Sequence, residues 1–390
     1  MDTPPGGFLL LREATLRDFC REILANCGVP PDHARLVSDS LVAAGLRGVD
    51  SHGVQLLPTY VAQLEAEAMD PNAVGKVVSE SGVCLTYDGE NALGQVVAEH
   101  CTEHALRLVG REGLAMVVAR HSNHFGAAAH WAQKLARAGH IGIVVTNASP
   151  AIAPWQGQSP RLGTNPICMA VPRGQSGRWI LDMATTTVAL GKASHAAYAG
   201  QPSIPAAWGF LDSDRNPTTD TSAAMKGFAT PVGGYKGSGL AMMVEILCAV
   251  LGGGPMATEV AIFREGREPL GVSHMFLAMD PTRFLGREEP GGAPARPPGD
   301  RGRNGSTSVG KGLDEFEARM DRLQSMIKSS EPASGYDEVL IAGEPEWRSE
   351  EKRRREGTPI PAGLWRVLST VAQRHNVVPP APGPDPDQAF

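Results

Sequence analysis

The sequence predicts a mixed α/β fold made of several packed lobes. The chain has 390 residues, of which 42% are hydrophobic, so it can bury a large core. Towards both ends, apolar residues recur at helical spacing, whereas the middle third has short apolar runs between glycine, proline and polar turns. These patterns indicate a central sheet with connecting helices, flanked by a helical part.

The first third is expected to be mainly helical. Apolar positions between Arg12 and Leu46 fall at helical spacing, and Pro30-Pro31-Asp32 would open the second of two helices there. Further along, the patterns predict a helix at 56–66, a strand and turn at 77–89, and a helix at 92–109.

The middle and last thirds supply the expected strands. Apolar runs predict strands at 115–119, 141–146, 167–171, 179–183 and 274–279. A strongly apolar helix is expected at 236–251, between a glycine-rich loop and Gly252-Gly253-Gly254. The segment 286–310 is rich in Gly, Pro and Arg and is expected to be a flexible insertion, followed by a helix at 313–327 and a loose tail from Pro379.

Composition argues against several classes of protein. The formal net charge of −6 and the absence of a basic patch with interleaved aromatics argue against nucleic-acid binding. The basic run 352–355 lies among glutamates and predicts a solvated helix face. The sequence has neither an apolar stretch long enough to span a bilayer nor an N-terminal signal pattern, so we expect a cytoplasmic protein without membrane contact.

The six cysteines form no Cys-x-x-Cys pair and fall mostly in apolar or helical patterns, which is typical of buried thiols in a reducing compartment. Three histidines, His121, His124 and His130, lie close together in the sequence, but no cysteine or His-Glu partner completes a recognised zinc spacing. We therefore expect no metal, and a zinc hydrolase is a weaker alternative.

Two polar segments have the composition of a functional site. The segment 47–53 places Arg47, Ser51 and His52 between glycines. It combines a guanidinium that can bind a carboxylate with two hydrogen bonds, a hydroxyl group, and an imidazole that can carry a proton. The segment 121–126 follows an expected strand and again combines imidazole, amide and glycine. Each alone could be a polar loop, but two such segments suggest one site.

A dinucleotide-binding Gly-x-Gly-x-x-Gly in a strand-turn-helix context is absent. The segment 233–239 places several amides and Lys236 at the start of a helix, where an anion is favoured, although its glycines could equally serve close packing. The hydroxyl-rich turn at 181–187 could bind a ribose or phosphate or only cap a helix. Taken without the other segments, the sequence at 163–166 predicts a tight turn with a structural role.

In this order, the segments resemble the malate/L-lactate dehydrogenase family of nicotinamide-dependent oxidoreductases, which lack a Rossmann fold. The resemblance extends from about residue 10 to residue 365. It rests on Arg-Gly-x-x-Ser-His-Gly at 47–53, Ser-Asn-His-Phe-Gly-Ala at 122–127, Ala-Pro-Trp at 153–155, Gly-Thr-Asn-Pro at 163–166, Asp-Met-Ala-Thr-Thr at 182–186, Gly-Lys at 191–192 and Lys-Gly-x-Gly-Leu at 236–240.

The resemblance implies a non-Rossmann α/β fold with a sheet-containing cofactor domain and a helical domain built from both termini. It implies NAD or NADP as cofactor, a small-molecule substrate and a homodimer. The expected division is a helical substrate and dimer domain from 1–60 with 311–375, a connecting lobe at 61–114, a nicotinamide cofactor domain at 115–285, the insertion at 286–310 and a disordered tail at 376–390.

The resemblance also assigns site residues. His52 and His124 match the family's site histidines, and the proton-transfer role falls on one or the other, with Ser51 positioning the imidazole or the substrate. The expected substrate contacts are Arg47, Asn123 and Thr164. The expected cofactor contacts are Asp182, Met183, Ala184, Lys236, Gly237, Gly343, Glu344 and Pro345.

The implied reaction is hydride transfer between nicotinamide and a 2-hydroxy or 2-oxo acid. Many members have Ser-His-Gly-x-x-Arg, whose Arg clamps the substrate carboxylate, but Leu56 stands at that position here. Ala148 also replaces a common serine beside the cofactor. The alternatives are therefore a reductase of a cyclic imino acid or diketo sugar acid, or a non-catalytic binding protein on the same scaffold.

Overall fold

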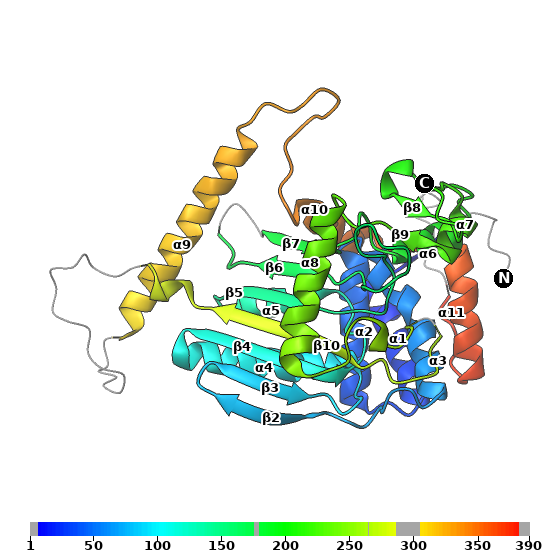
Figure 1. The fold of residues 1–390 in the computed structure, drawn as a ribbon, viewed down its shortest axis with the longest axis horizontal. Helices are drawn as coiled ribbons and strands as arrows, with labels where there is room; N and C mark the ends of the chain where they lie inside the picture. Colours follow the sequence, from blue (N-terminus) through cyan, green and yellow to red (C-terminus); the bar gives the residue numbers. More distant parts are fainter. Residues whose placement is uncertain (1–6, 175–178, 264, 286–304, 382–390) are drawn as a thin grey trace.

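The chain folds around a mixed seven-stranded sheet with helices on both faces (Figure 1). The computed structural model describes residues 7–174, 179–263, 265–285 and 305–381. The strand order is β2-β3-β4-β10-β5-β6-β7, in which β3 and β4 are parallel and the other neighbours are antiparallel. The mixed α/β fold class expected from the sequence is confirmed.

The elements have the following bounds. The strands are β1 Phe8–Leu11, β2 Lys76–Ser81, β3 Cys84–Asp88, β4 Leu114–Ser122, β5 Ile141–Thr146, β6 Ile167–Ala170, β7 Ile180–Met183, β8 Phe210–Leu211, β9 Phe228–Ala229, β10 Val272–Met279 and β11 Thr358–Pro361. The α-helices are α1 Glu13–Asn26, α2 Pro31–Leu46, α3 Leu57–Glu65, α4 Gly94–Glu112, α5 Ala128–Arg137, α6 Gly191–Tyr198, α7 Thr221–Lys226, α8 Tyr235–Glu245, α9 Gly305–Lys328, α10 Glu344–Glu356 and α11 Ala362–Arg374.

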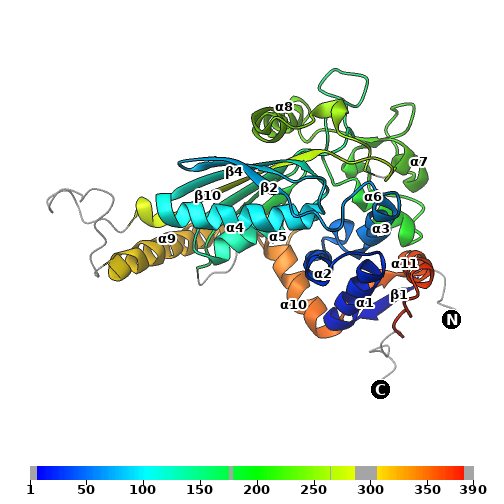
Figure 2. The same cartoon turned by 90° about the horizontal axis from the view of Figure 1, so that it is seen from below.

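The two ends of the described chain share one hydrophobic core. Leu16, Ile23 and Leu41 of α1 and α2 pack in the same cluster as Leu364 and Leu368 of α11. Figure 2 shows these helices gathered at one end of the molecule. The antiparallel pair of β1 with β11, in which Phe8 lies opposite Pro361, closes this part and was not predicted from the sequence.

The sheet is buried on both faces at its centre, which explains why its strands are nearly continuous apolar runs. Helices α4 and α5 pack on one face, where Trp131 and Phe276 are fully buried. On the other face α8 packs over Val118, Val145 and Met275 (Figure 2). The strand β10 comes late in the chain but lies between β4 and β5, so it joins the two halves of the sheet.

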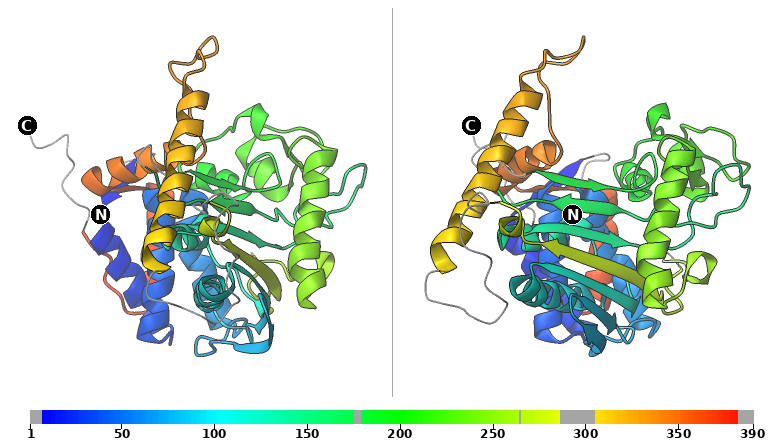
Figure 3. Two further views of the ribbon diagram at one scale, coloured as in Figure 1. Left: turned by 90° about the vertical axis from the view of Figure 1, so that its left-hand side faces the viewer. Right: turned by 60° about the vertical axis from the view of Figure 1, so that its left-hand side comes forward.

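The predicted helix at 236–251 is present but has an exposed outer face. After α8 the chain widens into a π-helical segment at Ile246–Val250. Met242, Ile246 and Val250 expose 59%, 47% and 55% of their surface. Both views in Figure 3 show α8 along the outside of the sheet, and Figure 1 shows α9 extending away from the sheet.

Parts of two predicted segments, the insertion and the tail, lie outside the described residues. Of the expected insertion at 286–310, residues 286–304 lie outside the described residues and 305–310 belong to α9. Of the expected tail at 376–390, residues 382–390 lie outside them, and Val377 is buried. Among the described helices, none combines the length and the apolar character that crossing a bilayer requires.

The basic run 352–355 lies on α10, and three of its four residues are exposed as predicted. Arg353 differs because its guanidinium forms a bidentate ion pair with Asp50, with 2.9 Å between Nη2 and Oδ2. This residue therefore fastens α10 to the polar segment at 47–53.

Candidate active site

The two polar segments predicted from the sequence meet in one large pocket. Its volume is about 1280 Å³, which exceeds the roughly 300–1,000 Å³ of sites for one small molecule. The walls come from the segment 47–59, the loop after β4, the chain after β5, the end of β7, α6 and the segment 341–346. The space suits a cofactor together with a small substrate.

The segment 47–53 is held rigidly at the end of α2. Gly48 has a φ of 75°, and a Cβ there would lie 2.8 Å from the Oγ of Ser349 on α10. The ion pair between Asp50 and Arg353 fixes the next turn. Position 48 therefore needs a glycine, both for its positive φ and for the short distance to Ser349.

A buried glutamine connects this segment to α6. The Nε2 of Gln55 donates to the carbonyls of Ser51 and Gly191, both at 3.2 Å. A Cβ on Gly191 would lie 2.8 Å from the Cβ of Ser51, so the start of α6 is pressed against the serine. Residues that follow Gly191 are thus placed directly beside the Ser51–His52 pair.

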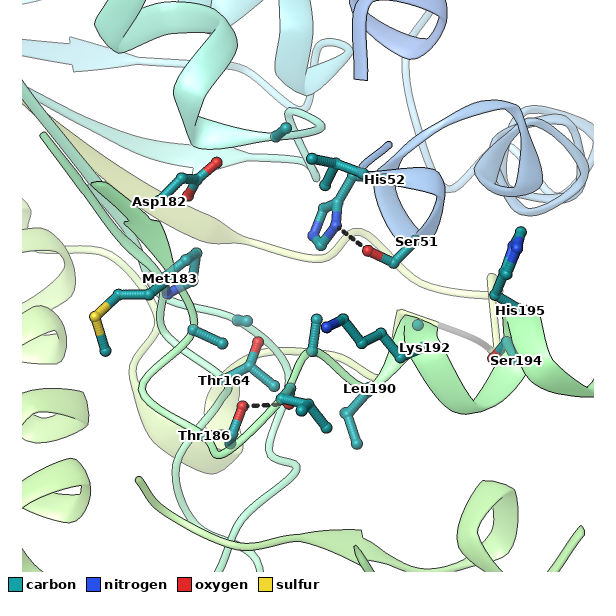
Figure 4. Close-up of a pocket in the computed structure, with 18 of the residues that line it drawn as sticks. Ser51, His52, Thr164, Asp182, Met183, Thr186, Leu190, Lys192, Ser194 and His195 are labelled. Atoms are coloured by element: carbon teal, nitrogen blue, oxygen red, sulfur yellow. Dashed lines mark hydrogen bonds between the residues drawn. The ribbon is translucent and has the colours of Figure 1, made fainter. Parts of the chain in front are cut away.

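Ser51 and His52 form a hydrogen-bonded pair, with 2.9 Å between Oγ and Nδ1 (Figure 4). This contact fixes the ring of His52 through Nδ1 and leaves Nε2 for a ligand. Burial lowers the pKa of His52 to about 4. At neutral pH its imidazole is therefore uncharged before a ligand binds.

His124 is positioned by residues of three different segments. Its Nδ1 lies 2.7 Å from the hydroxyl of Tyr60 and accepts from the amide of Gly126 at 3.3 Å. Phe263 stacks on the ring with 4.7 Å between centroids. Because Nδ1 accepts from an amide, the neutral ring carries its proton on Nε2.

The two imidazoles face each other, with 5.8 Å between ring centroids and an interplanar angle of 22°. Burial, followed by the charges of His52 and His274, lowers the pKa of His124 to about 3. The arrangement brings two neutral imidazoles together. Nε2 of His52 can accept a proton from a bound hydroxyl group when its Nδ1 donates to Ser51, whereas Nε2 of His124 already carries a proton and can donate it.

The end of β7 places a carboxylate on the opposite wall of the pocket. The Oδ2 of Asp182 accepts from the amide of Ala129 at the start of α5, at 3.1 Å. Burial raises the pKa of Asp182 to about 6, although the Ala129 amide and the charge of Arg47 act in the other direction. Met183 and Ala184 follow it along the pocket wall.

The turn at 163–166 combines a structural and a site role. Asn165 has a φ of 32° and is fully buried, and its Nδ2 donates to the carbonyl of Ala241 and to Oε1 of Glu245. The carbonyl of Thr164 accepts from the amide of Thr185 at 2.9 Å. This turn holds Thr164 in the pocket wall, where the resemblance places a substrate contact.

The pocket brings together most of the predicted site residues. Its walls include Arg47, Ser51, His52, His124, Thr164, Asp182, Met183, Ala184, Gly343 and Pro345. Asn123 is outside the lining because its amide is buried, where Nδ2 donates to the carbonyl of Ala92 at 2.9 Å and holds that loop.

Three predicted cofactor residues also lie outside the lining. Lys236 is exposed in the first turn of α8, four residues after the pocket residue Val232. Gly237 permits close packing, since a Cβ there would lie 2.4 Å from the amide nitrogen of Val232. The carboxylate of Glu344 is ion-paired with Lys328 and Arg348.

Sequence reasoning missed the residues that orient the histidines. Tyr60 and Phe263 contact His124 from distant segments, so no local pattern in the sequence indicates them. Lys192 belongs to the Gly-Lys pair quoted above, but no role was assigned to it, and the structure places it in the pocket wall. Within the described parts of the chain, no three His, Cys, Asp or Glu side chains group as metal ligands do.

The chain matches the malate/L-lactate dehydrogenase family model over residues 11–292 and 307–369. It is 34% identical to the L-sulfolactate dehydrogenase of Methanocaldococcus jannaschii, covering 93% of this chain and 96% of that one. It is 30% identical to hydroxycarboxylate dehydrogenase B of Escherichia coli, covering 92% of each. The solved malate dehydrogenase of Pyrococcus horikoshii superposes with a TM-score of 0.82 at 29% identity, over 97% of this chain and 99% of that one.

The chain therefore belongs to the malate/L-lactate dehydrogenase family, as the sequence motifs indicated. It is an oxidoreductase, and the alternative of a non-catalytic binding protein is set aside. The solved relatives share this fold across nearly the whole chain. Among the described strands, only β3 and β4 are parallel in its seven-stranded sheet, so it is not the parallel sheet to which a Gly-x-Gly-x-x-Gly turn belongs.

Proposed function

We propose that this enzyme transfers a hydride between NAD(P) and a small 2-hydroxy or 2-oxo acid. The observation that carries the proposal is the meeting of Ser51, His52 and His124 with the Asp182–Ala184 strand end in one pocket. The names of the relatives, sulfolactate, malate and hydroxycarboxylate dehydrogenases, support this substrate class.

The nicotinamide, when bound, supplies or accepts the hydride. Asp182, Met183, Ala184, Gly343 and Pro345 would hold it against one wall. Lys236, Gly237 and Glu344 lie outside the lining, and we keep them as proposed cofactor residues next to it. The backbone of Gly343 has a φ of 88° and packs against Ile180, so this wall is closely built. The volume of the pocket leaves room for the acid beside the histidines.

His52 or His124 would exchange a proton with the substrate oxygen at C2 through Nε2. Ser51 holds Nδ1 of His52, and Tyr60 holds Nδ1 of His124, so each ring presents the opposite nitrogen. With pKa values of about 4 and about 3, both rings are neutral at pH 7. Nε2 of His52 could then accept the proton of a hydroxy acid, whereas Nε2–H of His124 could donate to the oxygen of a 2-oxo acid. A substrate carboxylate nearby would raise these pKa values and favour the protonated ring needed for reduction.

The experiment that tests this function follows the loss of reduced-nicotinamide absorbance. Purified enzyme is mixed with NADH or NADPH and a panel of 2-oxo acids, diketo sugar acids and cyclic imino acids. We expect oxidation with at least one 2-oxo acid. Turnover only with a cyclic imino acid would replace the proposed substrate class, and failure to bind either cofactor would refute the proposal.

We also propose that the enzyme is a homodimer that covers the apolar outer face of α8, formed by Met242, Ile246 and Val250. Light scattering should give twice the mass of one chain, and Ile246→Asp should give the mass of one. Leu323→Asp on α9, a similarly exposed apolar position, should keep the dimer. Dissociation by Leu323→Asp, with Ile246→Asp still dimeric, would contradict this interface.

We propose a cytoplasmic location on the basis of the thiols. Cys20, Cys101, Cys168 and Cys248 are buried and unpaired, and burial raises the pKa of each thiol. Such thiols suit a reducing compartment.

A further inference from the structure

The pocket contains two strongly basic side chains, Arg47 and Lys192, among the residues that line it. Arg47 is buried near Asp182, and its charge lowers the pKa of that carboxyl, so the two charges offset each other. Lys192 has no such partner: within residues 7–174, 179–263, 265–285 and 305–381, no carboxylate forms an ion pair with it. Its Nζ lies over the ring of Trp208, 5.6 Å from the ring centroid.

The position of Lys192 follows from the contact between α6 and the Ser51–His52 pair. Gly191 packs against Ser51 and is bonded through its carbonyl to Gln55, which places the next residue beside the histidine. Figure 4 shows the ammonium group pointing into the space flanked by His52 and Thr164. The aromatic face of Trp208 attracts the ammonium and so favours this extended arrangement.

The usual cation of the family is missing from the same pocket. Leu56 stands where many members have the Arg that clamps the substrate carboxylate, and here it lines the pocket and packs against the helical core. A carboxylate bound beside His52 without a cation would lose most of its hydration for little compensation. The pocket therefore needs a positive charge on the histidine side, and Lys192 lies there.

We propose that Lys192 binds the carboxylate of the substrate and, with Leu56 in the pocket wall, is the main positive charge for that group. This inference rests on the proposed function. Lysine is a compact point charge, whereas arginine imposes a bidentate geometry, so an acid group bound by Lys192 without a second cation would be less strictly oriented. A carboxylate held there also lies close enough to His52 to favour its protonated form.

The test measures binding of oxamate, an analogue of a 2-oxo acid, by calorimetry to enzyme saturated with NADH or NADPH. In Lys192→Met the Kd for oxamate should rise about 10- to 100-fold, as expected for loss of a charge-assisted contact. The Kd for the cofactor and the Tm should change little. Lys192→Arg should recover part of the affinity, and so should Leu56→Arg in the Lys192→Met background.

The matched control is Lys226→Met on α7, which removes the same charge from an exposed residue outside the pocket lining. It should leave oxamate binding unchanged. With the best 2-oxo acid, Lys192→Met should raise KM much more than it lowers kcat.

Three results would overturn the proposal: unchanged oxamate binding in Lys192→Met, an equal loss of cofactor affinity, or a wild-type enzyme that binds cofactor but no oxamate. A wild-type enzyme that binds neither NADH nor NADPH would instead refute the proposed function.

Discussion

Replacing His52 with asparagine, or His124 with alanine, should lower kcat by ~10²–10⁴-fold, the usual contribution of a positioned acid or base. Both rings lie in the pocket with Nδ1 held by another residue, so each can exchange a proton only through Nε2. Steady-state kinetics with the best substrate measures the effect. The variant with the larger fall identifies the histidine that transfers the proton.

Cofactor binding should distinguish a chemical role from a structural one. The histidines contact Ser51, Tyr60 and Phe263, none of which is a predicted cofactor residue, so the Kd for NADH or NADPH should change by less than about twofold. The matched control is His121→Ala, because His121 is exposed and pairs with Asp88 rather than lining the pocket. Full turnover in both His52→Asn and His124→Ala would refute the assignment.

Gly94→Ala should reduce both stability and turnover. Gly94 begins α4, and a Cβ there would lie 2.1 Å from the carbonyl oxygen of Asn123 and 2.5 Å from that of His124. Backbone must move to relieve these contacts, which typically costs about 1–3 kcal/mol of unfolding free energy. Because the displaced backbone carries His124, kcat should fall on the order of 10²-fold, as for a misplaced catalytic group.

Gly110 offers a matched control on the same helix, because a Cβ there would meet nothing within 4 Å. Gly110→Ala should raise the free energy of unfolding by up to about 1 kcal/mol through helix propensity, with unchanged kcat. Urea denaturation and kinetics of both variants provide the comparison. A Gly94→Ala enzyme as stable and active as wild type would show that the loop before α5 is not held as described.

The parts of the fold that sequence predicts are those with a local signal. The strands β4, β5, β6 and β10 are apolar runs bounded by turns, and the structure has each of them. The pairing of β1 with β11 has no such signal, because its two short strands come from opposite ends of the described chain. The order of the sheet, with β10 between β4 and β5, is likewise set by tertiary packing.

The candidate site likewise contains residues that a local sequence pattern indicates and residues that only tertiary contacts identify. Ser51, His52 and His124 stand in compact polar segments whose composition suggested chemistry before any contact was known. The charged neighbours of Arg353 predict a solvated residue, but its ion pair with Asp50 connects α10 to the segment 47–53. The sequence shows Lys192 only as part of the Gly-Lys motif. Its proposed role depends on its place in the pocket and on the absence of a positive charge at Leu56.

The most direct measurement of the central claim is the fate of deuterium carried at C4 of the reduced nicotinamide. The enzyme is incubated with its best 2-oxo acid and NADH or NADPH that carries deuterium at both C4 positions, so that transfer from either face delivers label, and the product is analysed by mass spectrometry. Direct hydride transfer predicts one deuterium per product molecule, bonded to C2 of the hydroxy acid. A product without deuterium, or label released into water, would contradict hydride transfer in this pocket.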